Sequence, residues 1–173
     1  MAVSFGFTSF GGGSKSSNGG SSSGVSALGT FFDTTTQFAS IENNPYEIQF
    51  NTTDISEFVQ IANLSEIRPM VSGNYSVVFS AQLENFDSVN SGIVSMWLRK
   101  NGSDIPNSTN NVVLESGKTL LASWNYLVNI PANNNIEIIW CTSNINIKLV
   151  AVNKIPNTPY PASPSVFLNI NKI

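Results

Sequence analysis

The chain of 173 residues is long enough for one domain and a tail, and its hydrophobic fraction of 41% suffices for a core. Charged residues make up only 11%, against about 25% in typical soluble domains, so the polar surface must come from Asn, Ser and Thr. With no histidine and one cysteine, Cys141, the chain excludes zinc sites, Ser-His-Asp triads, Cys-His dyads and an intrachain disulfide.

The charge balance and the apolar runs limit the classes of partner. The formal net charge is −3, and Arg99 and Lys100 are the only adjacent basic pair, so we expect no nucleic-acid partner. No apolar run approaches the roughly 18 residues of a membrane span, and no secretory signal is visible at the N-terminus.

Residues 1–24 have the composition of a flexible tail, because a Gly- and Ser-rich segment buries too little surface to offset its ordering entropy. Phe5, Phe7 and Phe10 stand near its start, where a pure spacer needs no aromatic residue. One interpretation is an anchor that inserts into a groove on a partner; the other is a disordered tail with incidental aromatics.

From Val25 onward, apolar residues alternate with polar ones between turn signals that recur about every ten residues. The alternation is clearest at Tyr75, Val77, Phe79, Ala81 and Leu83. In chain order, strands are expected at 30–36, 46–51, 57–62, 74–83, 93–99, 120–130, 136–140, 145–149 and 166–170. The stretch 93–99 reads as a more fully buried strand.

The breakers fall between these segments. Asn101-Gly102 is a tight-turn dipeptide directly after a strand, and residues 133–135 are three consecutive asparagines. Four prolines between 156 and 164 predict an extended loop before the last strand. Since no segment shows a helical stripe with caps, the pattern predicts an all-β domain over 25–173, either a sandwich or a barrel.

The segment Gly73-Asn74-Tyr75-Ser76-Val77-Val78-Phe79 resembles the G-x-Y-x-F-x-F/Y signature of the complement and tumour necrosis factor superfamily of jelly rolls. Val77 departs from the usual Phe, and Gln60 and Ile67 stand where that superfamily commonly has aromatics. The resemblance implies an antiparallel jelly-roll β-sandwich.

A wider resemblance, over residues 29–173, is to jelly-roll domains of bacteriophage and large-virus structural proteins. It rests on segments 29–37, 50–56, 79–83, 97–102, 122–126 and 164–173. The resemblance implies a homotrimer on a virion, made in the host cytoplasm, that serves as a capsid decoration protein, head fibre or fibre tip. It implies capsid or fibre proteins as partners, no catalytic residues and no cofactor.

Aromatic residues are more numerous than one small core obviously needs, and aromatics are enriched at association surfaces. The alternative is that most of them fill the sandwich interior. The candidate trimer-interface residues are Phe31, Phe32, Tyr46, Tyr75, Trp97, Trp124 and Tyr126.

Acidic residues offer two weaker interpretations. Loop acids such as Asp33, Asp54 and Asp87 could bind calcium, but no spaced D-x-D-x-D cluster appears, so we expect solvated acids and no metal site. A glycosidase would need two carboxylates facing one cleft, with Glu84 and Asp87, or Glu115 and Glu137, as the available pairs.

Three hypotheses remain open. In the first, the chain is a non-enzymatic virion structural protein whose tail attaches the head to a capsid or fibre. In the second, it is a receptor-binding tip that recognises a host glycan or protein through loops such as 101–111. In the third, it is a carbohydrate-active enzyme.

Overall fold

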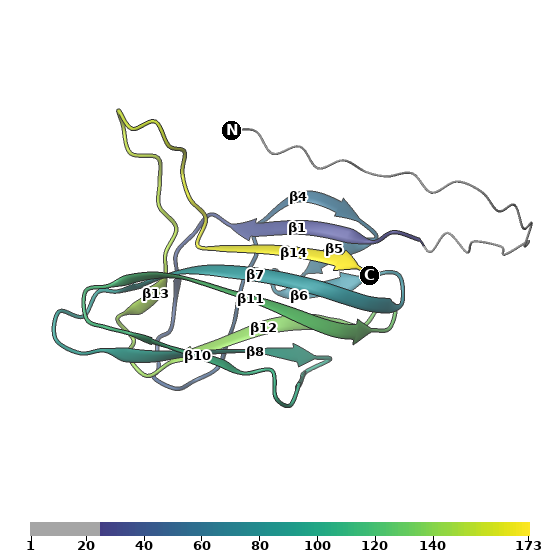
Figure 1. The fold of residues 1–173 in the computed structure, drawn as a ribbon, viewed down its shortest axis with the longest axis horizontal. Coiled ribbons are helices and arrows are strands. Elements are labelled where there is room, and N and C mark those ends of the chain that lie inside the picture. The colour runs from purple at the N-terminus through teal and green to yellow at the C-terminus, as the bar shows by residue number, and fades with distance from the viewer. Residues whose placement is uncertain (1–24) are drawn as a thin grey trace, which may run out of the picture.

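The computed structural model describes residues 25–173; the expected tail, with its candidate anchor at Phe5, Phe7 and Phe10, lies outside the described residues. Within 25–173 the chain is all-β, and its strands form two antiparallel sheets. The sheets lie as two layers whose strands run along the long axis of the molecule (Figure 1). The jelly-roll sandwich expected from the sequence is confirmed.

The first sheet is organised around strand β7 (Gly73–Asn85). Along one edge β7 pairs with β11 (Thr119–Ile130), and along the other it pairs with β14 (Val166–Lys172) and β13 (Ile147–Leu149). Beyond these lie β1 (Leu28–Asp33) on β14, β2 (Gln37–Phe38) on β13, and β4 (Thr52–Glu57) on β1.

The second sheet has β8 (Gly92–Lys100) and β12 (Ile136–Thr142) at its centre. On the outer side of β8 lie β10 (Asn110–Leu114) and the short β9 (Ser103–Asp104). On the outer side of β12 lie β3 (Tyr46–Glu47) and β6 (Glu66–Pro69), and β5 (Val59–Ala62) pairs with β6.

Alternation along the strands builds the core between the sheets, as the sequence predicts. The five apolar residues of β7 from Tyr75 to Leu83 are fully enclosed, and the residues between them face outward. The largest enclosed side chains are those of Trp140, Tyr75, Phe31 and Phe79. In residues 25–173 every buried polar side-chain atom has a hydrogen-bond partner, so the interior is both apolar and satisfied.

Two predicted breaks are also present. Asn101 and Gly102 have φ of 48° and 78° and form the two-residue turn between β8 and β9, where positive φ at both positions favours an Asn-Gly pair. Between β13 and β14 the chain leaves the sheet as an arm, residues 152–163, that projects from the sandwich (Figure 1). Its root is closed by reciprocal backbone hydrogen bonds of 2.9 and 2.8 Å between Val152 and Ser163.

The expected strand boundaries differ from the structure where burial is incomplete. Only 46–47 of the expected strand 46–51 pairs, whereas the ladder forms at 52–57, an edge strand whose side chains are mostly exposed. Strands β6 and β10 are not among the expected strands, because four and five residues are too few for a distinct pattern. Strand β8 is not buried on both faces, since Ile93 is exposed on its outward side.

Candidate association surface

The outward face of the first sheet carries no charged residue over the middle of four adjacent strands, β11, β7, β14 and β1. Strand alternation turns the apolar residues of these strands inward and leaves small polar and some apolar side chains outside. We call this surface the neutral face; it consists of Leu28, Thr30, Phe32, Ser76, Val78, Ser80, Gln82, Leu121, Ser123, Asn125, Leu127, Phe167, Asn169 and Asn171.

Four of the eight polar side chains of the neutral face are hydrogen-bonded to one another in two pairs. Thr30 Oγ1 donates to Asn169 Oδ1 at 2.7 Å, and Ser76 Oγ donates to Asn125 Oδ1 at 3.1 Å. Beside them the rings of Phe32 and Phe167 stack at 6.4 Å between centroids with 12° between their planes. Because the face has no ionic group and two of its asparagines already accept hydrogen bonds, covering it with another protein surface desolvates no charge.

Strand β11 forms one border of the neutral face and has a free edge. It runs for 12 residues and pairs only with β7, so half of its backbone groups point away from the sheet. The strand contains no charged residue and no proline, and Leu121 and Leu127 are exposed on its outward side. Natural proteins usually protect such an edge with lysine, proline or a covering segment, so this edge is suited to contact with another subunit.

The structure separates the seven aromatic residues expected at a trimer interface. Phe32 lies on the neutral face. Trp124 and Tyr126 point inward from the edge strand β11 and are half-buried; Trp124 stacks on Phe79 at 6.1 Å. Tyr46 packs against the core beside Trp140, and Trp97 is half-buried on the outward side of the second sheet.

Phe31 and Tyr75 are corrections to the sequence-based assignment. Both side chains are fully enclosed in the core of the single chain and therefore offer no surface to a second subunit. The Tyr75 hydroxyl donates to the Val71 carbonyl at 2.5 Å, and burial raises the pKa of this tyrosine. The residues missed from the sequence are Leu121 and Leu127, which interrupt the polar side of an otherwise alternating strand.

The carboxylate pairs considered for glycoside hydrolysis do not meet in one cleft. Glu115 follows β10 beside Gly92, whereas Glu137 lies opposite Arg99 at the other end of β8. Glu84 and Asp87 line separate hollows: Glu84 one of about 360 Å³, and Asp87 one of about 390 Å³ that it shares with Glu42. Hydrogen bonds from the Asn90 and Val89 backbone amides and from asparagine side chains hold the pKa of Asp87 well below its usual range. It stays an anion and is poorly suited to donate a proton as a general acid.

Residues 25–173 contain no helix with the length and apolarity that a membrane crossing requires. In the same range, no three acidic or cysteine side chains are grouped closely enough to hold a metal ion.

The outward side of the second sheet, in contrast to the neutral face, carries an acidic cluster. Glu137 is only 6% exposed, and Ser65 Oγ lies 3.4 Å from its Oε1 and 3.3 Å from Glu47 Oε2. Burial raises the pKa of Glu137, the neighbouring carboxylates of Glu47 and Glu66 raise it further, and Arg99 opposes the shift. The charged form of Glu137 is therefore disfavoured in the folded state.

This cluster predicts a pH dependence of stability. Because the pKa of Glu137 is higher in the folded than in the unfolded chain, its contribution to stability is complete below the unfolded pKa and is lost as the pH rises through the folded pKa. We expect Glu137→Gln to raise the urea midpoint at pH 7 relative to the parent chain, and to change it little at pH 4.

The control is Glu42→Gln, at an exposed loop position outside the cluster. Chemical denaturation at both pH values measures the effect. Equal midpoints for Glu137→Gln and the parent chain at pH 7 would contradict the assigned role of the cluster.

Comparison with known proteins identifies the fold and no closer relationship. No protein-family model matches the chain, and no curated protein matches it in sequence. Among solved structures, the chain is similar to the crystal structure of mouse APRIL, a jelly roll of the tumour necrosis factor type. The TM-score is 0.51 at 9% sequence identity, and the match covers 86% of this chain and all of the mouse chain. The chain therefore has a tumour necrosis factor-like jelly-roll fold.

Proposed function

We propose that the chain is a structural protein of a virion, a homotrimeric jelly roll that decorates a capsid or forms part of a head fibre. The observation that carries the proposal is the neutral face with the uncharged free edge of β11 beside it. A surface with apolar side chains, internally bonded amides and no charge favours permanent contact with an equally neutral surface. We infer the trimeric state and the location on a virion from the sequence resemblance to viral jelly-roll proteins.

The proposed attachment is through the tail. A closed trimer has three tails, and each tail carries Phe5, Phe7 and Phe10. Three weak apolar anchors that meet matching sites on a symmetric shell raise one another's effective concentration, so their joint affinity exceeds that of a single tail. Binding alone accounts for this function, and capsid or fibre proteins of the same particle are the partners.

A charge placed on the neutral face should dissociate the trimer. We expect the parent chain to have three times the 18.6 kDa mass of one chain, and Leu127→Lys to have the mass of one, because burying a lysine without a partner is costly. Light scattering coupled to gel filtration measures both masses.

Val113→Lys is the matched control. Val113 is 66% exposed on β10, outside the neutral face, and Leu127 is 72% exposed. The control should remain trimeric. A monomeric parent chain, or a Leu127→Lys variant that stays trimeric, would contradict the proposed interface.

Removal of the tail should abolish attachment without unfolding the head. We expect residues 25–173 to remain trimeric and to be lost from particles to which the full chain binds, as shown by co-sedimentation with particles assembled without the protein. Phe5→Ser/Phe7→Ser/Phe10→Ser keeps the tail length and should behave in the same way. A tailless head that still co-sediments would show that the tail is not the anchor.

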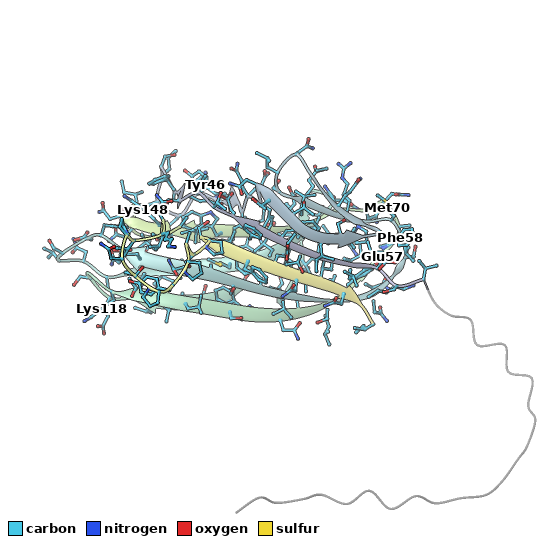
Figure 2. All side chains as sticks on the ribbon, turned by 90° about the horizontal axis from the view of Figure 1, so that it is seen from above. Tyr46, Glu57, Phe58, Met70, Lys118 and Lys148 are labelled. Atoms are coloured by element: carbon cyan, nitrogen blue, oxygen red, sulfur yellow. The ribbon has the colours of Figure 1, made fainter. Side chains whose placement is uncertain are left out.

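One observation favours receptor binding as a second function. The end of the sandwich opposite to Phe58 and Met70 carries Lys148 and Lys118 (Figure 2). There Lys148 Nζ lies 5.1 Å from the centroid of the Phe38 ring and 4.4 Å from that of Phe86. Phe38 also lines a hollow of about 230 Å³ with Tyr46 and polar side chains, a combination of ring faces and hydrogen-bonding groups that suits a sugar.

The loop 101–111, which the sequence offers as a receptor-binding loop, begins at the other end of the sandwich. Asn101 is hydrogen-bonded through its backbone amide to Asn135, and the nearby Asn133 amide donates to the Pro69 carbonyl. The turn at 101–102 is therefore near Met70, at the opposite end from Lys148 and Phe38.

Glycan recognition predicts a difference between two exposed phenylalanines. We expect the parent chain to bind specific glycans on an array, and Phe38→Ala to lose at least ten-fold in affinity because the stacking surface is removed. Phe58→Ala is the control, since the two rings are similarly exposed, at 59% and 46%, at opposite ends of the head. Absence of any glycan signal, or equal binding by Phe38→Ala, would remove this second function.

A further inference from the structure

Phe58 and Met70 form an apolar pair at one end of the sandwich. The Met70 amide donates to the Phe58 carbonyl at 2.8 Å, which places the two residues opposite each other at the open end of the β5–β6 hairpin. Their side chains are 46% and 47% exposed. An aromatic ring and a thioether, which adapts its shape readily, together make a surface suited to apolar contact.

The backbone at Phe58 is in an unfavourable conformation. Its φ is +54°, in the left-handed region that bulky residues rarely adopt. Burial of the side chain does not offset this unfavourable conformation, because Phe58 is 46% exposed. Such conformations are retained where the surrounding structure enforces them, and they concentrate at sites of contact with ligands.

The described chain begins beside this pair. Leu28 pairs with Glu57, the residue before Phe58, so Val25 lies only three residues from the pairing site. Val25, Ser26, Lys172 and Ile173 line an open hollow of about 280 Å³, and Val25 and Ile173 are themselves exposed. Glu57, Phe58 and Met70 lie together at this end of the head (Figure 2). Leu28 pairs with both Glu57 and Asn171, so Val25 and Ile173 lie at the same end of the head as Phe58 and Met70. We call these four exposed apolar residues the exit patch: Val25, Phe58, Met70 and Ile173.

We propose that the segment with Phe5, Phe7 and Phe10 docks on the exit patch of its own chain, so that the head covers the tail's phenylalanines until a partner competes for them. The sequence between Phe10 and Val25 has 14 residues, which span at most about 50 Å at roughly 3.5 Å per residue. That length permits the segment to turn back onto the end of the head from which it starts.

Tethering favours this occupant over a separate partner. A segment joined by a short linker is present at an effective concentration of the order of millimolar, so even a weak apolar contact is populated. The contact would shield three phenylalanines that otherwise promote self-association. The inference takes the anchor residues from the proposed function, but the docking itself needs no particle.

The methionines of the chain provide the test. There are three: Met1 in the tail, Met70 in the exit patch and Met96 fully enclosed in the core. The full chain, labelled with carbon-13 at the methionine methyl groups, is compared by NMR with Phe5→Ser/Phe7→Ser/Phe10→Ser and with residues 25–173. We expect the Met70 methyl resonance to move in both variants, because it loses the ring currents of the docked phenylalanines, while that of Met96 stays in place.

A synthetic peptide of residues 1–16, added to the 25–173 head, should return the Met70 resonance toward its position in the full chain. Identical Met70 resonances in the full chain and both variants would overturn the docking. Failure of the full chain to bind particles would instead overturn the proposed attachment and leave the Met70 result intact, so the two failures are distinguishable.

Discussion

Strand β7 is hydrogen-bonded along both of its edges, to β11 on one side and to β14 and β13 on the other. This double pairing holds together segments far apart in the chain, such as Tyr75 and Lys172, which are 97 residues apart. It also fixes the register of four adjacent strands, and a shift of one residue would exchange the core-facing and outward-facing side chains of the whole set. The enclosed interior and the neutral face are thus two results of one set of backbone pairings.

The distribution of charge divides the molecule into regions with different properties. The neutral face is free of ionic groups, whereas the outward side of the second sheet holds the glutamates around Ser65 together with Arg68 and Arg99. A trimer formed through the neutral face would leave the acidic cluster on its outside, in contact with solvent. The same packing would leave both ends of the sandwich accessible. One end could then attach to the particle and the other could bind a receptor.

The sequence predicted the sandwich because its strongest strands bury one face only, as Tyr75 to Leu83 illustrate. It could not separate core from surface aromatics, since Phe31 and Phe32 differ by one position and their faces depend on the pairing with β14 and β4. The burial of Glu137 was equally hidden, because Ser65 and Glu47 reach it from segments more than 70 residues away. Edge strands such as β4, with Thr, Asp, Ser and Glu exposed, carry no alternation to detect.

The arm at residues 152–163 interrupts what would otherwise be one strand along β7, yet the ladder resumes on both sides of it. Because the Val152–Ser163 bridge closes the root, the length and sequence of the arm beyond that bridge are uncoupled from the sheet. The head can therefore diversify there through insertion without repacking its interior. In a repeating shell, the same position would offer a site at which a foreign epitope is displayed in many regularly spaced copies.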